Sequence, residues 1–164
     1  MPLTRPIGAA IAAGLALAGC SGGNELAGSL GELTPLAFTG TVVSDDQSQL
    51  VVAYHDAPDG GIASGNVPFE LAVEVGKGPL DAGTTFDLAA LDPSGEPVAL
   101  ASRSVAGDPR AFPQIQKGTL TLDSSIAVGA KGSGHFFLVF DYQQDGTLGQ
   151  GRTVQGSFEG VVSQ

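Results

Sequence analysis

Tryptophan and tyrosine, the large aromatic residues with a polar group on the ring, are scarce in this chain. The 164 residues contain no tryptophan and two tyrosines, Tyr54 and Tyr142, beside eight phenylalanines. Sugar-processing and sugar-binding sites favour Trp and Tyr, whose large rigid rings present broad contact faces. This scarcity argues against a carbohydrate enzyme and, less strongly, against a carbohydrate-binding module. The seventeen Asp and Glu residues do not reverse that argument, because any acidic chain offers a pair of carboxylates.

Cysteine occurs once, at position 20, and the chain after it contains none. No disulfide can therefore brace the chain beyond that position, although disulfides are common in exported proteins. A segment of this length buries enough surface to form a core without covalent staples. Its stability is expected to come from apolar burial and from hydrogen bonds within sheets.

Cations are also few. Seven Lys and Arg stand against seventeen Asp and Glu, which gives a net charge of −10. Such a surface repels phosphate backbones, so we expect no nucleic-acid partner. It also repels anionic lipid headgroups, so attachment to a membrane should come from a lipid rather than from a basic patch.

The two histidines, His55 and His135, limit metal and nucleophile chemistry. A zinc site needs three or four ligands, and the densest candidate group is His55 and Asp56 with Asp59. The interpretation we prefer is a strand end entering a Pro-Gly turn, whose aspartates cap backbone N–H groups; His135 is expected at a strand entry. The nearest match to a G-x-S-x-G nucleophile motif, residues 61–65, has the wrong spacing. We therefore predict no catalytic residues and no metal site.

Aspartate pairs at the expected loop edges leave calcium binding open. They are Asp45-Asp46, Asp56 with Asp59, and Asp141 with Asp145. Calcium takes several oxygen ligands, and none of these pairs fits the D-x-[DN]-x-[DN]-G pattern of an EF-hand loop. Loops at one end of a β fold can pool their carboxylates, so a calcium-stabilised module stays an alternative.

The N-terminal segment has the composition of an export signal. Arg5 and the free amine supply positive charge, and residues 7–17 (IGAAIAAGLAL) are apolar throughout. A helix that spans a bilayer needs about 20 apolar residues, and this run is shorter. A charged start, a short apolar stretch and small residues before a boundary indicate a cleavable signal peptide.

The residues that close this segment are Leu17-Ala18-Gly19-Cys20. They resemble the lipobox of bacterial lipoproteins at all four positions. The resemblance implies a diacylglyceryl group on the Cys20 thiol and cleavage between Gly19 and Cys20. A thiol suits that step because its thiolate is strongly nucleophilic. Ser21, where aspartate would favour the inner membrane, resembles the outer-membrane class in a cell that has such a membrane.

Residues 21–32 (SGGNELAGSLGE) are rich in Gly and Ser and show no sustained period. We interpret them as a flexible tether with an r.m.s. span of roughly 20 Å. The predicted organisation is a signal peptide over residues 1–19, the lipidated Cys20 and tether over residues 20–35, and one domain over residues 36–164.

From residue 36 onward the hydrophobic period is two. Phe69, Leu71, Val73 and Val75 share one side of a strand whose other side carries glutamates. Further strands are expected at residues 36–43, 85–91, 98–103, 119–122 and 154–162. Residues 50–54 (LVVAY) and 136–140 (FFLVF) are apolar on both sides, which predicts central strands covered on each face.

These patterns predict an all-β fold, an antiparallel β-sandwich or a small β-barrel of about eight strands, after the signal helix and tether. The corresponding function is a lipid-anchored protein of the cell envelope with a non-catalytic structural or binding role. In a cell with an outer membrane it would face the periplasm or the cell surface. It needs no cofactor beyond the acyl lipid, and its protein or glycan partner is open. The alternatives are a metal-assisted hydrolase using His55, Asp56 and Asp59, or a calcium-stabilised module that binds sugar or protein.

Overall fold

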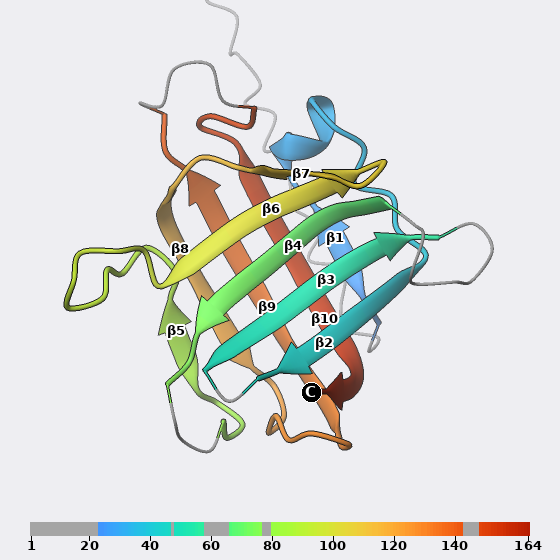
Figure 1. Ribbon diagram of the computed structural model, residues 1–164, viewed down its shortest axis with the longest axis vertical. Helices are drawn as coiled ribbons and strands as arrows, with labels where there is room; N and C mark the ends of the chain where they lie inside the picture. The colour runs from blue at the N-terminus through green and yellow to red at the C-terminus, as the bar shows by residue number, and fades with distance from the viewer. Residues whose placement is uncertain (1–22, 47, 58–65, 77–79, 143–147) are drawn as a thin grey trace, which may run out of the picture.

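The computed structural model describes residues 23–46, 48–57, 66–76, 80–142 and 148–164 (Figure 1). In these ranges the chain forms ten strands and one short 3-10 helix, η1, which confirms the all-β prediction. They are β1 (Glu25–Ala27), η1 (Ser29–Glu32), β2 (Gly40–Asp45), β3 (Gln49–Asp56), β4 (Asn66–Glu74), β5 (Thr85–Asp87), β6 (Ala99–Val105), β7 (Asp108–Ala111), β8 (Ile115–Leu122), β9 (Lys131–Phe140) and β10 (Thr153–Ser163).

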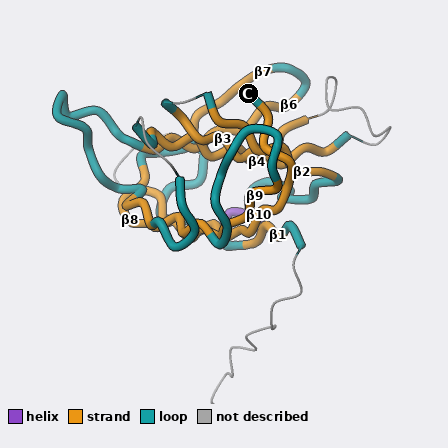
Figure 2. Tube along the Cα trace, turned by 90° about the horizontal axis from the view of Figure 1, so that it is seen from below, coloured by secondary structure: helices purple, strands orange, loops and turns teal. Residues whose placement is uncertain are grey.

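The strands form one curled sheet in the order β5-β8-β9-β10-β2-β3-β4-β6-β7, with β1 also paired to β10. The sheet folds over into two layers whose strands cross in Figure 1, and Figure 2 shows the layers from their edge. We call β2, β3, β4, β6 and β7 the front layer, and β5, β8, β9, β10 and β1 the rear layer. Every pairing is antiparallel except that of β10 with β2, where Val162 lies opposite Val43. The result is a half-barrel that fits the predicted sandwich or barrel, with one parallel junction that was not predicted.

Alternation along the strands places the core between the two layers. On β4, Phe69, Leu71 and Val73 are buried, whereas Glu70 is half-buried and Glu74 is exposed. Phe69 stacks on Phe136 of β9 with ring centroids 5.7 Å apart, so aromatic packing joins front to rear. The predicted one-sided burial of this strand is confirmed.

The prediction that β3 and β9 are covered on both faces is wrong at three outward positions, although the outward Ala53 of β3 is buried. Phe137 of β9 is 40% exposed, and Val51 of β3 and Val139 of β9 are half-buried. The fold has two layers, so the outer face of each sheet has no further layer over it among the described residues. Apolar composition on both sides of a strand therefore marks an open apolar face here.

The predicted tether is wrong over the part of it that the structure describes. Ser157 Oγ donates to the Gly23 carbonyl at 2.8 Å, and the Glu159 backbone N–H donates to Asn24 Oδ1 at 2.5 Å. β1 then pairs with β10, and Leu30 is fully buried. The folded body thus already includes Gly23 and does not begin at residue 36.

Two physical causes explain this docking. β2 pairs with β10 only at Val162 and Ser163, which leaves the edge of β10 at residues 155–157 free to bind β1. Gly28 has φ +140°, and a Cβ there would lie 2.2 Å from the Thr153 carbonyl oxygen. Gly28 lies in a stretch whose composition is typical of a flexible linker, but here a glycine is needed because its backbone approaches that of Thr153 closely.

Two predicted strands are shorter than expected. The strand predicted over residues 36–43 begins at Gly40, and Phe38 before it packs edge-on against the Tyr54 ring at 4.9 Å. The strand predicted over residues 85–91 ends at Asp87, whose Oδ1 accepts the Ala89 N–H at 3.0 Å and turns the chain. The predicted signal helix lies outside the described residues, and none of the helices in the described ranges is long and apolar enough to cross a bilayer.

Candidate functional site

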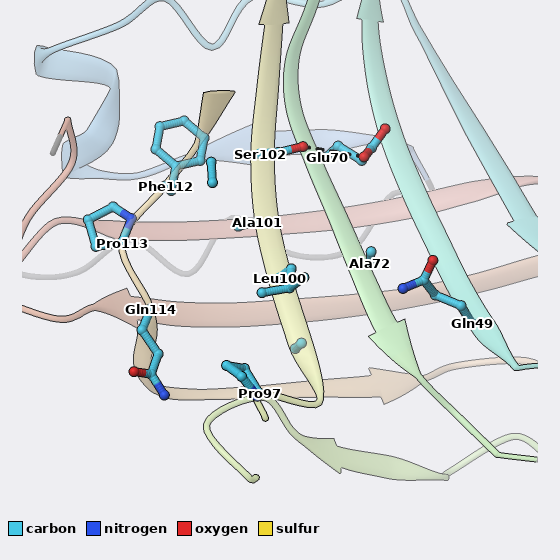
Figure 3. A pocket seen from close by; sticks show the side chains of 12 residues that line it. Gln49, Glu70, Ala72, Pro97, Leu100, Ala101, Ser102, Phe112, Pro113 and Gln114 are labelled. Atoms are coloured by element: carbon cyan, nitrogen blue, oxygen red, sulfur yellow. Dashed lines mark hydrogen bonds between the residues drawn. The ribbon is translucent and has the colours of Figure 1, made fainter. Parts of the chain in front are cut away.

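A groove of about 490 Å³ lies on the outer face of the front layer (Figure 3). Strands β3, β4 and β6 form its floor, and the chain between β7 and β8 forms one wall. Its lining residues are Gln49, Glu70, Ala72, Pro97, Ala99, Leu100, Ala101, Ser102, Ala111, Phe112, Pro113 and Gln114. We call this feature the outer groove.

The floor is hollow where a small residue stands beside a larger one. Ala72 of β4 and Leu100 of β6 lie side by side and face outward. Ala72 ends at its Cβ, so the space above it stays open, and Leu100 beside it is 58% exposed. On β6 the small residues Ala99 and Ala101 point inward instead and are buried. The sequence therefore places the larger side chain on the outside of this strand.

Polar groups border the apolar floor. Ser102 Oγ donates to Glu70 Oε1 at 3.3 Å, and the amides of Gln49 and Gln114 stand at opposite sides (Figure 3). Glu70 is the one ionisable side chain among the described residues that line the groove. The arrangement suits the binding of an apolar group by contact, with hydrogen bonds at its border.

A second cavity, of about 270 Å³, lies between the ends of β3, β4 and β6 and the segment after η1. Asp56, Asn66 and Arg103 are among its lining residues. Arg103 Nη1 donates to the buried Thr34 Oγ1 at 2.9 Å, which fixes the guanidinium in the wall. This contact ties the N-terminal segment to β6.

The predicted metal-ligand group is only partly within the described residues. His55 and Asp56 lie at the end of β3, and Asp59 falls outside the described ranges. The His55 Nδ1 atom is buried without a hydrogen-bond partner, whereas Asp56 lines the second cavity. In the described part of the chain, no group of three or more His, Cys, Asp or Glu side chains is placed to hold a metal ion.

His135 lies inside β9 rather than at a strand entry. Its Nδ1 is 3.0 Å from Asp123 Oδ1 and 3.2 Å from Oδ2, a pair that was not predicted from the sequence. Asp123 directly follows β8, whose Thr121 lies opposite His135, so strand register is the signal that would have found it. Ser157 lies opposite His135 on the other side, but its hydroxyl donates to the Gly23 carbonyl. The three residues do not form a hydrogen-bonded Ser–His–Asp chain.

Asp46, one of the aspartates considered for calcium, caps the turn between β2 and β3. Its Oδ1 accepts hydrogen bonds from the Ser48 N–H at 3.0 Å, the Ser48 hydroxyl at 3.0 Å and the Gln49 N–H at 2.7 Å. The Ser48 backbone hydrogen bond, with those of Gln49 N–H and the Ser48 hydroxyl, holds the pKa of Asp46 below its usual range. Of the other aspartates considered for calcium, Asp59 and Asp145 lie outside the described residues.

The outer groove is not among the sites predicted from the sequence. The signal in the sequence is Leu100, a large apolar residue at an outward position of β6. Cys20 and Gly19, the predicted lipidation and cleavage residues, lie outside the described ranges. No protein-family model, curated protein or solved structure matches this chain.

Proposed function

We propose that this protein is an exported bacterial lipoprotein, held on a bilayer by acyl chains on Cys20, with a non-catalytic binding role. The lipobox resemblance at Leu17-Ala18-Gly19-Cys20 suggests the anchor. The observation that carries the proposal is the position of the first described contacts and of the buried core. Its first described contacts are made by Gly23, and the buried core residues of the described ranges run from Leu30 to Val162. Cleavage before Cys20 would therefore leave this core intact.

The binding role rests on the outer groove. An apolar hollow with a polar border is the usual form of a ligand site, and it occupies a sheet face that no other described element covers. The ligand class it suits carries an apolar group for the hollow over Ala72 and a hydrogen-bonding group for Glu70, Ser102 or the two glutamines. The proposed location is the cell envelope, and Ser21 after the cysteine favours the outer membrane where the cell has one.

The anchor is tested by Cys20→Ser in the full-length chain expressed in a bacterium. We expect the variant to leave the membrane fraction or to accumulate as unprocessed precursor, whereas Ser21→Ala stays with the membranes and is processed. Mass spectrometry should find an acylated Cys20 as the first residue of the native protein. An intact Met1 together with a free thiol contradicts the proposal.

The groove is tested with the neutral dye Nile Red, whose fluorescence rises in apolar surroundings. We expect Leu100→Gln to lower the fluorescence gained on adding protein, because it makes the floor polar. Leu91→Gln is the matched control, since Leu91 is 55% exposed and lies outside the groove lining. Equal loss in the two variants, or none in Leu100→Gln, contradicts a binding site there.

A further inference from the structure

The N-terminal segment is fixed to β10 close to the predicted lipid attachment site. Gly23 and Asn24 hydrogen-bond to Ser157 and Glu159, and β1 continues along the same edge. The next part of that edge, at Val162 and Ser163, is occupied by β2. The chain between Cys20 and Gly23 therefore meets the folded body beside Glu159.

Covalent geometry limits the distance between this point and the lipid. Three residues span at most about 11 Å even when fully extended. A free tether over residues 21–32 would have an r.m.s. span of roughly 20 Å and would leave the orientation of the body undetermined. Docking of Gly23 replaces that freedom with a short connection to one defined place on the rear layer.

The surface around this place consists of the outward-facing residues at the joined ends of β9 and β10. Lys131 lies opposite Val161, and Ser133 lies opposite Glu159. Val161 is 70% exposed, an apolar side chain on the outer face of the sheet. The turn between β8 and β9 adjoins them, because the Gly129 N–H donates to the Val162 carbonyl at 2.8 Å, and Val128 in this turn is also exposed. We call Val128, Lys131, Glu159 and Val161 the anchor-side patch.

Charge pairing makes this patch compatible with a lipid surface. Lys131 Nζ lies 2.6 Å from Glu159 Oε1, so the carboxylate of the residue whose backbone N–H binds Asn24 is paired. An unpaired carboxylate within about 10 Å of an anionic leaflet would be repelled, because that is the range of unscreened charge in physiological salt. The pair reduces this repulsion at the position where the connection to the lipid is shortest.

From these observations, and resting on the proposed lipidation of Cys20, we infer that the body lies directly on the bilayer with the anchor-side patch against the headgroups. The outer groove is on the opposite layer and faces away from that surface, toward the aqueous space. The bilayer thus selects which face of the protein is open to a ligand.

Site-directed labelling tests this orientation in the lipidated full chain. Acylation blocks the thiol of Cys20, the one natural cysteine, so a nitroxide attached at Val161→Cys or Leu100→Cys reports on that position alone. In phosphatidylcholine vesicles that contain a nickel-chelating lipid, we expect several-fold faster nitroxide relaxation by nickel at position 161 than at position 100. Val128→Cys serves as a second reporter of the patch and should behave as Val161→Cys does.

Insertion of a twelve-residue Gly-Ser linker after Gly22 provides the decisive comparison. The linker should reduce the difference between positions 161 and 100 while the protein still floats with the vesicles. If the protein floats with vesicles but nitroxide relaxation is equal at positions 100, 128 and 161, the orientation is wrong and the anchor is still supported. A difference between positions 161 and 100 that the linker does not change has the same two consequences. Failure of the natural chain to float overturns the anchor itself, and with it the orientation.

Discussion

The Tyr54 hydroxyl of the front layer donates a hydrogen bond of 2.8 Å to the Ser157 carbonyl of the rear layer. The hydroxyl of the same Ser157 holds the Gly23 carbonyl. Three parts of the chain therefore meet at one residue of β10: β3 of the front layer, the rear layer and the N-terminal segment that begins the described residues. Burial raises the pKa of the Tyr54 hydroxyl above its usual value, so this group is a proton donor near neutral pH.

Tyr54→Phe should destabilise the protein. The substitution leaves the ring but removes the donor, and the Ser157 carbonyl loses a buried partner. We expect a loss of about 1–2 kcal/mol in the free energy of unfolding, measured by urea denaturation. Tyr142→Phe is the control, because Tyr142 is exposed and its change should stay within about 0.5 kcal/mol. Equal stability of the two variants would show that the bond contributes nothing.

Gly156→Ala should also destabilise the fold. A Cβ at position 156 would lie 2.7 Å from Cζ of Phe136 and 2.8 Å from the Tyr54 hydroxyl oxygen. Both neighbours are buried and packed, so the core has to shift at a cost of about 1–3 kcal/mol. Gly40→Ala, with nothing within 4 Å of its added Cβ, provides the control. The measurement is the midpoint of thermal unfolding of the two variants. A packing effect lowers the midpoint of Gly156→Ala alone, whereas a general effect of replacing glycine lowers both midpoints alike.

Hydrophobic alternation was enough to predict the class of fold and the inward residues of β4, β8 and β10. Side chains two apart must share a face of a strand, and this rule depends on no distant contact. The Phe136 ring covers Gly156, whereas Gly160 has the aliphatic Val43 as its nearest neighbour.

Features that depend on contacts between distant segments could not be predicted. Gly28 and Leu30 lie in a stretch with the composition of a linker. That stretch is nevertheless bound by an unpaired edge of β10, a strand more than a hundred residues later in the chain. The two-sided apolar pattern of β9 did not reveal that Phe137 would be exposed, because the number of layers is a property of the whole sheet. The pairing of His135 with Asp123 likewise follows from strand register, which no local pattern reports.

Leu30→Ala tests whether the N-terminal segment is part of the body. Leu30 is fully buried and belongs to the main core, so its truncation should cost about 2–5 kcal/mol. Leu33→Ala, three residues along at an exposed position, should change stability by less than about 0.5 kcal/mol. The measurement is chemical denaturation of the domain from residue 21 onward. Equal, small effects at both positions would contradict the docking of this segment and support a flexible tether.

Asp46→Asn should weaken the dependence of stability on acid pH. The hydrogen bonds from Ser48 and Gln49 lower the pKa of Asp46 in the folded state, while the unfolded chain keeps a value of about 3.9. The contribution of this carboxylate is therefore complete above pH 4 and is lost as the pH falls through the lower, folded value. Asparagine keeps an acceptor oxygen for the turn but cannot be protonated, so the urea midpoints at pH 7 and pH 3 should lie closer together than in the natural chain. Asp46→Ala removes the acceptor and should lower the midpoint at pH 7 as well; an asparagine variant with an unchanged acid response would mean that the turn does not depend on the charge of Asp46.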